Sequence, residues 1–271
     1  MQKRRALVVG SKGMLGYAVA ADLERAGYSV KSISRADFDI ARDPFERFVP
    51  LIDDVDMVVN CAGVIKPQIA TMSIEDVLRV NTVFPRNLGL LCKDRIHCYH
   101  VTTDCVYSGR KGNYSETDFF DAEDVYGMSK NGGDTSDAMT LRTSIIGEES
   151  GQQRSLLSWA MSQHSKEVNG FTNHRWNGVT TTHLSEVIRA IEEQDLYQRG
   201  IFHIHSPEVV TKFELVQLMS DVYELDLRIN PQEAAEASDR SLASVHSLSG
   251  KVATKSIRTQ LEEMKQFFSP R

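Results

Sequence analysis

The sequence lacks any run of about 18 consecutive apolar residues, the length that a membrane-spanning helix requires. The apolar stretch nearest the amino end covers only residues 6–9 before Gly10, which is too short for the core of a signal peptide. We therefore expect no association with a membrane and a location in the cytoplasm.

Cysteine is scarce, and its spacing excludes two kinds of site. The four cysteines are Cys61, Cys92, Cys98 and Cys105. None forms a CxxC pair, so neither a zinc site nor a disulfide framework is indicated, and we expect reduced thiols. His203 and His205 would share one face of a strand, but no further ligands stand at a reachable spacing. We expect no metal ion.

An excess of positive charge is also missing. The 31 Lys and Arg residues are outnumbered by 37 Asp and Glu, for a net charge of −6. This balance argues against a nucleic-acid partner, because binding to phosphates needs a basic surface. The length of 271 residues and the 41% of hydrophobic residues predict a globular protein with one large domain or two unequal lobes.

Short apolar runs alternate with amphipathic patterns of helical period. The runs predict buried strands at residues 6–9, 30–34, 57–60, 98–103, 140–146 and 201–205. Helical spacing predicts helices over residues 14–26, 74–91, 183–193 and 212–222. Alternation of this kind is typical of an α/β fold with a doubly wound parallel sheet.

A glycine-rich loop directly follows the first predicted strand and opens the first helix. The glycines allow a sharp turn, a close approach of the backbone to a pyrophosphate and close packing of helix on sheet. Free N–H groups at the helix start would then bind the phosphates. We expect a dinucleotide to contact the loop residues Gly10, Lys12, Gly13, Met14, Leu15 and Gly16.

Charge near the end of the second predicted strand indicates which dinucleotide binds. An acid there would hydrogen-bond the ribose hydroxyls of NAD, but this chain has Ser34 and Arg35, with Lys12 in the loop. Two cations suit a 2′-phosphate. We expect a preference for NADP(H), with NAD(H) as the alternative.

A tyrosine and a lysine four residues apart form the candidate catalytic pair. In a helix, Tyr126 and Lys130 would share one face, and the ammonium would favour the phenolate of the tyrosine. Thr103 ends the fourth predicted strand, where its hydroxyl can hydrogen-bond a substrate carbonyl. Trp176 could stack on a base or sugar of the substrate.

The ordered motifs GSKGMLG, NCAG, VTTDCVYSG, VYGMSK and LRTSIIG resemble one branch of the extended short-chain dehydrogenases/reductases. The set is similar to the dTDP-4-dehydrorhamnose reductase family, over roughly residues 5–190. The family usually has an aromatic residue where this chain has Cys105, and a proline that the stretch 173–181 lacks. The sugar and the nucleotide therefore stay open.

The resemblance implies roles for particular residues. Thr103, Tyr126 and Lys130 would be the catalytic triad. Further cofactor contacts would come from Asp39, Ile40, Cys61, Ala62 and Gly63. Substrate contacts would come from Asp104, Tyr107, Ser144 and Arg240, with Trp176 added from its own chemistry. Residues 1–147 would form the dinucleotide-binding core, and residues 148–271 would complete the sheet and form a smaller substrate-binding lobe.

We therefore expect an NADPH-dependent reductase of a nucleotide-linked 4-keto-6-deoxy sugar, serving polysaccharide or glycan precursor synthesis. Two alternatives stay open. One is a nucleotide-sugar epimerase of the same superfamily; a dehydratase is less favoured, because Thr103 is followed by Asp104 and Cys105 without a second acid. The other is a non-catalytic NADP-binding regulatory subunit. The resemblance allows a homodimer, and residues 230–249 read as a surface connector or a mobile loop near the substrate.

Overall fold

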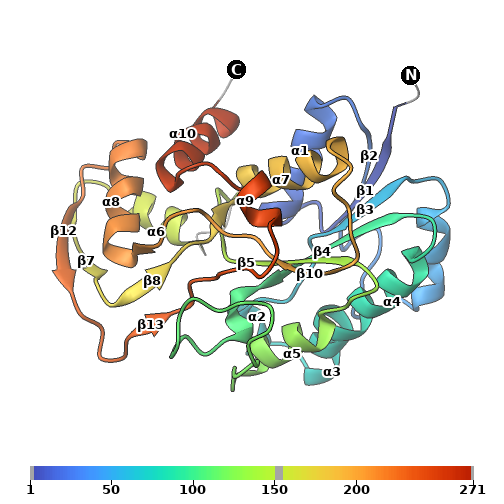
Figure 1. Ribbon diagram of the computed structural model, residues 1–271, viewed down its shortest axis with the longest axis horizontal. Helices are drawn as coiled ribbons and strands as arrows, with labels where there is room; N and C mark the ends of the chain where they lie inside the picture. The colour runs from blue at the N-terminus through green and yellow to red at the C-terminus, as the bar shows by residue number, and fades with distance from the viewer. Residues whose placement is uncertain (1–2, 150–154, 270–271) are drawn as a thin grey trace.

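A six-stranded parallel sheet runs through the larger part of the molecule (Figure 1). The computed structural model describes residues 3–149 and 155–269. The strands, in spatial order, are β10 (Gly200–His203), β5 (Met139–Thr143), β4 (His97–Thr103), β3 (Met57–Asn60), β1 (Arg5–Val9) and β2 (Ser29–Ile33). All neighbouring pairs are parallel, so the predicted doubly wound α/β fold is confirmed.

The order of the strands reverses at β1, and this sets the position of the binding crevice. β1 pairs with β2 on one side and with β3 on the other. The connections that leave the carboxyl ends of β1 and β3 therefore diverge to opposite sides. In open α/β sheets, ligands bind in the crevice that opens at such a reversal.

Helices cover both faces of the sheet (Figure 1). On one face, α1 (Met14–Arg25) and α7 (Thr181–Glu193) bury apolar side chains at helical spacing against the strands. On the other face lie α3 (Ile74–Leu78), α4 (Phe84–Cys92) and α5 (Val125–Gly133). Shorter helical segments precede them, namely the 3-10 turns Phe45–Arg47 and Val49–Ile52 and helix α2 (Lys66–Ile69).

The helix predicted over residues 74–91 is present but contains a π turn. α3 is followed by a π-helical turn over Arg79–Val83, and α4 then begins. The turn precedes Pro85, which has no N–H to donate to the carbonyl of Asn81 and whose ring crowds that carbonyl. A wider turn at this point accommodates the proline.

Two predicted strands end at least two residues earlier than the sequence indicated. β5 stops at Thr143, and Ile145–Ile146 forms a separate strand, β6, that pairs with β9 (Val179–Thr180). The carbonyl of Ser144 accepts a hydrogen bond from Val179, and this pulls the chain out of the main sheet. β10 stops at His203, so His205 lies in the following loop and the two histidines do not share a strand face.

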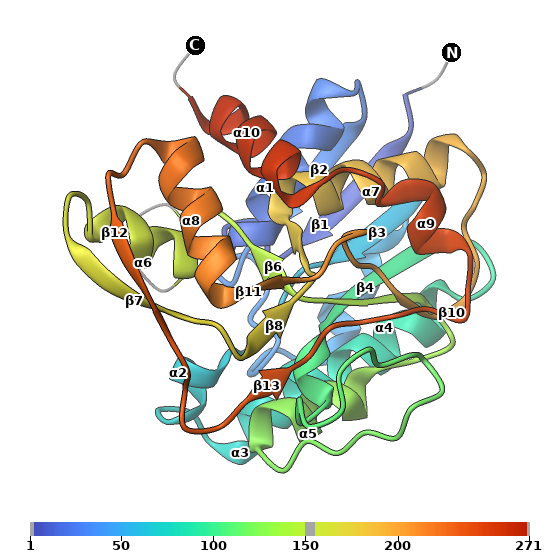
Figure 2. The same ribbon diagram turned by 60° about the vertical axis from the view of Figure 1, so that its left-hand side comes forward.

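A smaller lobe lies beside the carboxyl ends of the strands (Figure 2). Helices α6 (Leu156–Ser162), α8 (Lys212–Tyr223) and α10 (Ile257–Phe268) share an apolar core. Short strands complete the lobe: β7 (Glu167–Phe171), β8 (His174–Trp176), β11 (Val210–Thr211), β12 (Arg228–Gln232) and β13 (Ser238–Asp239). Because β10 and α7 return to the core, the segment after residue 147 contributes to both parts.

Residues 230–249 form an ordered connector that binds the lobe to the core. The Asp239 amide donates to the carbonyl of Gly109, and Tyr114 exchanges backbone hydrogen bonds with Ser241 and Ala243. The side chain of Arg240 donates to two backbone carbonyls, at Tyr107 and Ser108. Helix α9 (Leu248–Val252) follows this connector.

In the described ranges no helix is long and apolar enough to cross a membrane.

The layer between α1, α7 and the sheet dominates the core, so a cavity there should be costly. Ile188 of α7 is fully buried, and we expect Ile188→Ala to lower the free energy of unfolding by about 2–5 kcal/mol. Ile74 is 54% exposed, and Ile74→Ala should change this free energy by less than about 0.5 kcal/mol. Urea-induced unfolding measures both, and equal losses would contradict this account of the core.

Candidate active site

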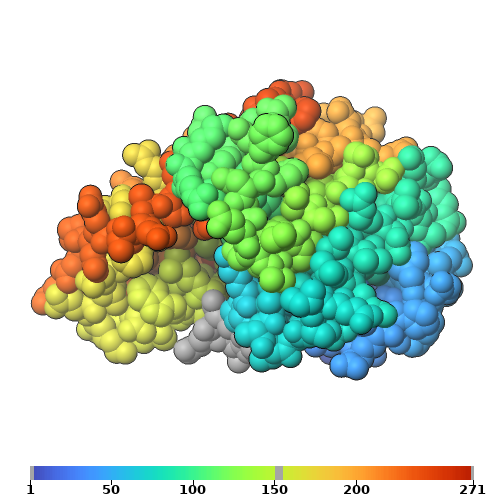
Figure 3. Space-filling view, turned by 90° about the horizontal axis from the view of Figure 1, so that it is seen from below, coloured from blue at the N-terminus to red at the C-terminus, as the bar shows by residue number. Residues whose placement is uncertain are grey.

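A cleft of about 940 Å³ opens between the carboxyl ends of the central strands and the smaller lobe. Figure 3 shows the two parts from below, with the core in blue to green, the lobe in yellow to orange, and a hollow where they meet. The cleft lining includes Thr103, Asp104, Tyr126 and Lys130 from the core, together with Ser144, Trp176 and Lys212. The structure therefore brings the three predicted catalytic residues to one cavity.

Local structure explains how Tyr126 reaches Thr103. The carboxylate of Asp124 accepts a hydrogen bond from the Gly127 amide at 2.8 Å and so caps the start of α5. Lys66 holds that carboxylate through an ion pair of 2.7 Å. Tyr126 and Lys130 then lie one helical turn apart on α5 beside the end of β4, where Thr103 stands.

Burial governs the acid–base properties of the pair. It raises the pKa of the Tyr126 phenol, while a hydrogen bond from Thr103 acts in the opposite direction. It also lowers the pKa of Lys130 to about 8, against the field of the Asp134 carboxylate, which raises it. Lys130 is therefore mostly charged at pH 7, and it lies one helical turn from Tyr126 on α5.

Asp104 offers an acceptor next to the catalytic hydroxyl. Its side chain is buried in the cleft wall, and Oδ1 lies 3.2 Å from the Thr103 hydroxyl, which can donate to it. Burial raises the pKa of Asp104, and the positive charges of Arg240 and Lys212 lower it. Such a carboxylate can accept hydrogen bonds from hydroxyl groups of a bound ligand.

A second pocket of about 570 Å³ lies at the ends of β1, β2 and β3 and adjoins the cleft. The predicted cofactor residues that line it are Gly10, Lys12, Gly13, Ser34, Arg35, Asp39, Ile40, Cys61, Ala62 and Gly63. Met14 and Leu15 line the cleft instead. The start of α1 has no side-chain cap and no acid in its first turn, so its N–H groups are available to phosphates. These residues fit a dinucleotide.

The charges around this pocket favour an additional phosphate. Lys12 and Arg35 are exposed at its rim, and within the described residues neither has an ion pair or a hydrogen bond. Asp37, which no sequence motif singled out, accepts hydrogen bonds on its carboxylate from the amide and hydroxyl of Ser34. Ser34 is therefore engaged with an acid, while the two cations stay available.

Two predicted substrate residues lie outside the cleft lining. The ring of Tyr107 is fully buried and stacks on Tyr114, and its hydroxyl donates to the carbonyl of Ser115. Arg240 holds the connector on the core, as described above. These placements do not support a direct substrate contact by Tyr107, and for Arg240 such a contact stays a prediction.

Lys212 is a cleft residue that sequence reasoning missed. It is the first residue of α8, and its ammonium lies 5.5 Å from the centroid of the Trp176 ring. In the part of the chain that the structure describes, it has no ion pair or hydrogen bond, and burial lowers its pKa. A cation is unfavourable at a helix start, and this was the available signal that Lys212 is a candidate ligand-binding residue.

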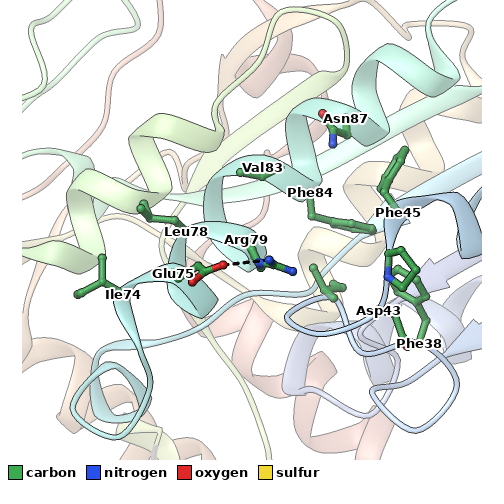
Figure 4. A pocket seen from close by; sticks show the side chains of 12 residues that line it. Phe38, Asp43, Phe45, Ile74, Glu75, Leu78, Arg79, Val83, Phe84 and Asn87 are labelled. Atoms are coloured by element: carbon green, nitrogen blue, oxygen red, sulfur yellow. Dashed lines mark hydrogen bonds and ion pairs between the residues drawn. The ribbon is translucent and has the colours of Figure 1, made fainter.

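A further pocket, of about 670 Å³, lies against α3 and α4 (Figure 4). Phe38, Phe45 and Phe84 give it an apolar lining. Its charged residues are Glu75 and Arg79, which pair with each other at 2.9 Å, and Asp43, which pairs with Arg47. Among the described residues that line it, every charged side chain therefore has a partner. No group of three or more metal-ligating side chains occurs among residues 3–149 and 155–269.

Comparison with known proteins gives a family match over nearly the whole chain. Residues 4–268 match the model of the RmlD substrate binding domain. A probable low-salt glycan biosynthesis reductase, Agl14 of Haloferax volcanii, is 28% identical over 238 residues, which cover 80% of this chain and 79% of that protein. The methionine adenosyltransferase 2 subunit beta of Danio rerio is 25% identical over 249 residues, covering 82% and 75% of the two chains.

Among solved structures, a dTDP-4-dehydrorhamnose reductase from Bacillus anthracis in complex with NADP superposes with a TM-score of 0.82. The match covers 98% of this chain and 100% of that chain at 17% sequence identity. At this identity the likeness establishes the fold.

The close approach of α1 to the phosphate loop gives a direct test of the dinucleotide pocket. A Cβ at Gly16 would lie 2.7 Å from the carbonyl carbon of Gly10, so Gly16→Ala must displace the loop. We expect NADPH affinity, measured by fluorescence titration, to fall at least about tenfold, or ~1.4 kcal/mol. Gly250→Ala, where a Cβ meets open space, is the control and should leave the affinity unchanged. Equal affinities of the two variants would refute the assignment.

Proposed function

The chain belongs to the RmlD substrate binding domain family, and we propose that this NAD(P)-dependent oxidoreductase uses NADPH to reduce a nucleotide-linked 4-keto-6-deoxy sugar. The observation that carries the proposal is the meeting of Thr103, Tyr126 and Lys130 in one cleft that adjoins the dinucleotide pocket. The product would be the corresponding deoxy sugar, a precursor for polysaccharide or glycan synthesis.

Each member of the triad has a role that follows from its place. Bound in the pocket, the reduced nicotinamide supplies a hydride for the carbonyl carbon of the sugar. Tyr126 donates its phenolic proton to the carbonyl oxygen, so the carbonyl becomes an alcohol. Thr103 orients that oxygen by a hydrogen bond, and the Lys130 ammonium favours the phenolate that remains on Tyr126.

The preference for NADPH rests on the charges at the pocket rim. Lys12 and Arg35 are two exposed cations without partners in the described ranges, and a 2′-phosphate would pair with both. NAD(H) lacks that phosphate and would bind more weakly. The NADP complex of the Bacillus anthracis relative agrees with this choice.

The substrate lobe supplies contacts for an anionic, ring-shaped ligand. Lys212 offers an unpaired ammonium and Trp176 an aromatic ring on the lobe side of the cleft. Asp104 offers an acceptor for sugar hydroxyls on the core side. We assign Lys212 to the diphosphate of the substrate and Trp176 to stacking against the sugar or base.

A regulatory subunit is the second candidate, because the chain is also similar to methionine adenosyltransferase 2 subunit beta. An isolated chain that oxidises NADPH with one member of a panel of nucleotide 4-keto-6-deoxy sugars would reject that candidate. A folded chain that binds NADPH, turns over no member and copurifies with a larger enzyme would favour it instead.

Removing the phenolic proton tests the catalytic assignment. We expect Tyr126→Phe to lower kcat by about 10²–10⁴-fold, the usual contribution of a general acid, with little change in NADPH affinity. Tyr28→Phe is the matched control, because Tyr28 directly precedes β2 at the opposite end of the sheet. Full turnover by the Tyr126→Phe variant would contradict the proposed mechanism.

The assignment of Lys212 predicts a selective effect on the substrate. Lys212→Met keeps the length of the side chain and removes its charge, so KM for the nucleotide sugar should rise about tenfold or more, the equivalent of one charge-assisted hydrogen bond. We expect KM for NADPH to change less than about twofold. Steady-state kinetics measures both, with Lys251→Met on the exposed face of α9 as the control. An unchanged KM for the sugar contradicts the assignment.

A further inference from the structure

We propose that Asp134, one helical turn after Lys130, is a positioning residue that keeps the Lys130 ammonium charged and in place beneath the cleft. The inference rests on the proposed reductase function, because it concerns the state of a residue in that mechanism. It also explains a buried group of polar side chains that no step of the mechanism uses.

The first observation is that Lys130 is held without direct partners. It is 5% exposed, and among the described residues its ammonium has no hydrogen bond or ion pair. It lies directly over Gly63, where any Cβ would overlap the ammonium. A buried charge in this situation loses its hydration and tends to release its proton unless an opposite charge stabilises it.

The groups that face Lys130 leave one source of negative charge. Tyr126 lies on the same helix, Cys61 follows β3 and His100 is on β4. Burial raises the pKa of Cys61 to about 12 and lowers the pKa of His100 to about 3, so both are neutral at pH 7. Burial raises the pKa of Asp134 as well, but the adjacent Arg142 guanidinium lowers it, and the 2.6 Å ion pair between them keeps Asp134 as the carboxylate that faces this group.

The second observation is the unequal use of the two oxygens of Asp134. Its Oδ2 accepts hydrogen bonds from the Nη2 and Nε of Arg142, at 2.6 and 3.2 Å. Both side chains are buried, with 0% of Arg142 and 2% of Asp134 exposed. In the described part of the chain, Oδ1 is buried without a partner of normal hydrogen-bond geometry, and the Thr102 hydroxyl of the neighbouring strand is the polar group that lowers the pKa of Asp134 beside Arg142. An unpartnered buried carboxylate oxygen is costly, and its field is available to Lys130.

Arg142 holds the Asp134 carboxylate in one position. Its Nη1 donates to the Tyr107 hydroxyl at 3.0 Å and lies 2.8 Å from Nε2 of His203. Thr102 and His100, one β-strand over, also carry buried polar atoms without partners among the described residues. The Asp134–Arg142 pair is therefore a rigid, desolvated charge pair, and its negative end acts on the catalytic lysine.

The arrangement has a consequence for the pH dependence of catalysis. With Asp134 present, the pKa of Lys130 is lowered by burial only to about 8. The ammonium is present below that pH and is lost above it, so kcat/KM should fall as the pH rises through about 8. Without the carboxylate the pKa would be lower still, and the fall would begin at a lower pH.

The test compares pH profiles of kcat/KM in four variants. Asp134→Asn removes the charge but leaves Arg142 buried without a counter-ion, and this variant risks misfolding. The double variant Asp134→Asn/Arg142→Met removes both charges together and is the decisive protein. Asp134→Glu is the conservative rescue. Glu116→Gln is the matched control, because Glu116 bonds to His203 and Ser244 in the same network, away from Lys130.

For the folded double variant, we expect the alkaline fall of the kcat/KM profile to shift to lower pH by about one unit or more. This shift lowers kcat/KM at pH 9 about tenfold. Asp134→Glu should restore the limb, and Glu116→Gln should leave it in place. A folded double variant with an unmoved limb overturns the inference and makes Asp134 a counter-ion of Arg142 alone.

A second measurement separates this inference from the proposed function. Carbon-13 NMR of protein labelled at the lysine ε-carbons follows the titration of Lys130 without turnover, with Lys130→Met identifying its signal. A lower titration midpoint in the double variant supports the inference even if no sugar is reduced. An unchanged midpoint overturns it whatever the enzyme does.

Discussion

A lysine ammonium buried at the floor of the cleft is the constraint on which the site depends. In the proposed mechanism Lys130 must stay charged to favour the phenolate of Tyr126, yet burial alone favours its neutral form. The carboxylate that we propose to keep it charged is Asp134, one helical turn away, and the buried Arg142 holds that carboxylate by a hydrogen bond. Glycine at position 63 leaves the space that the ammonium occupies. Charge, counter-charge and space must therefore coincide between α5 and the segment that follows β3.

The walls of the cleft depend on how the lobe is attached to the core. Arg240 donates to the carbonyls of Tyr107 and Ser108, and Asn177 forms two hydrogen bonds of 2.8 Å with Leu242. The Arg240 contacts use backbone carbonyls of the loop that directly follows Thr103, so the segment next to the candidate catalytic hydroxyl also supports the lobe. A ligand between the two parts is thereby presented to Thr103 and Lys212 from opposite sides.

Local motifs predicted much of the site, because their residues are close in sequence and act through one element. The glycine loop follows β1 and opens α1 as expected, and Tyr126 and Lys130 share one face of α5. Residues whose role depends on distant partners were harder to place. Tyr107 was expected at the substrate, but its ring packs on Tyr114 and its hydroxyl meets Arg142. The break at Ser144 follows from a hydrogen bond to Val179, 35 positions later in the chain.

The sequence by itself determined the fold class, the dinucleotide loop and the candidate catalytic side chains, since each follows from residue types at short, regular spacing. Only the tertiary structure decided which side chains share the cleft and which carry charge there. Lys212 comes to the site from the start of α8, and Asp134 meets Arg142 across two elements. Burial and pairing between distant segments set these properties, and no spacing along the chain encodes them.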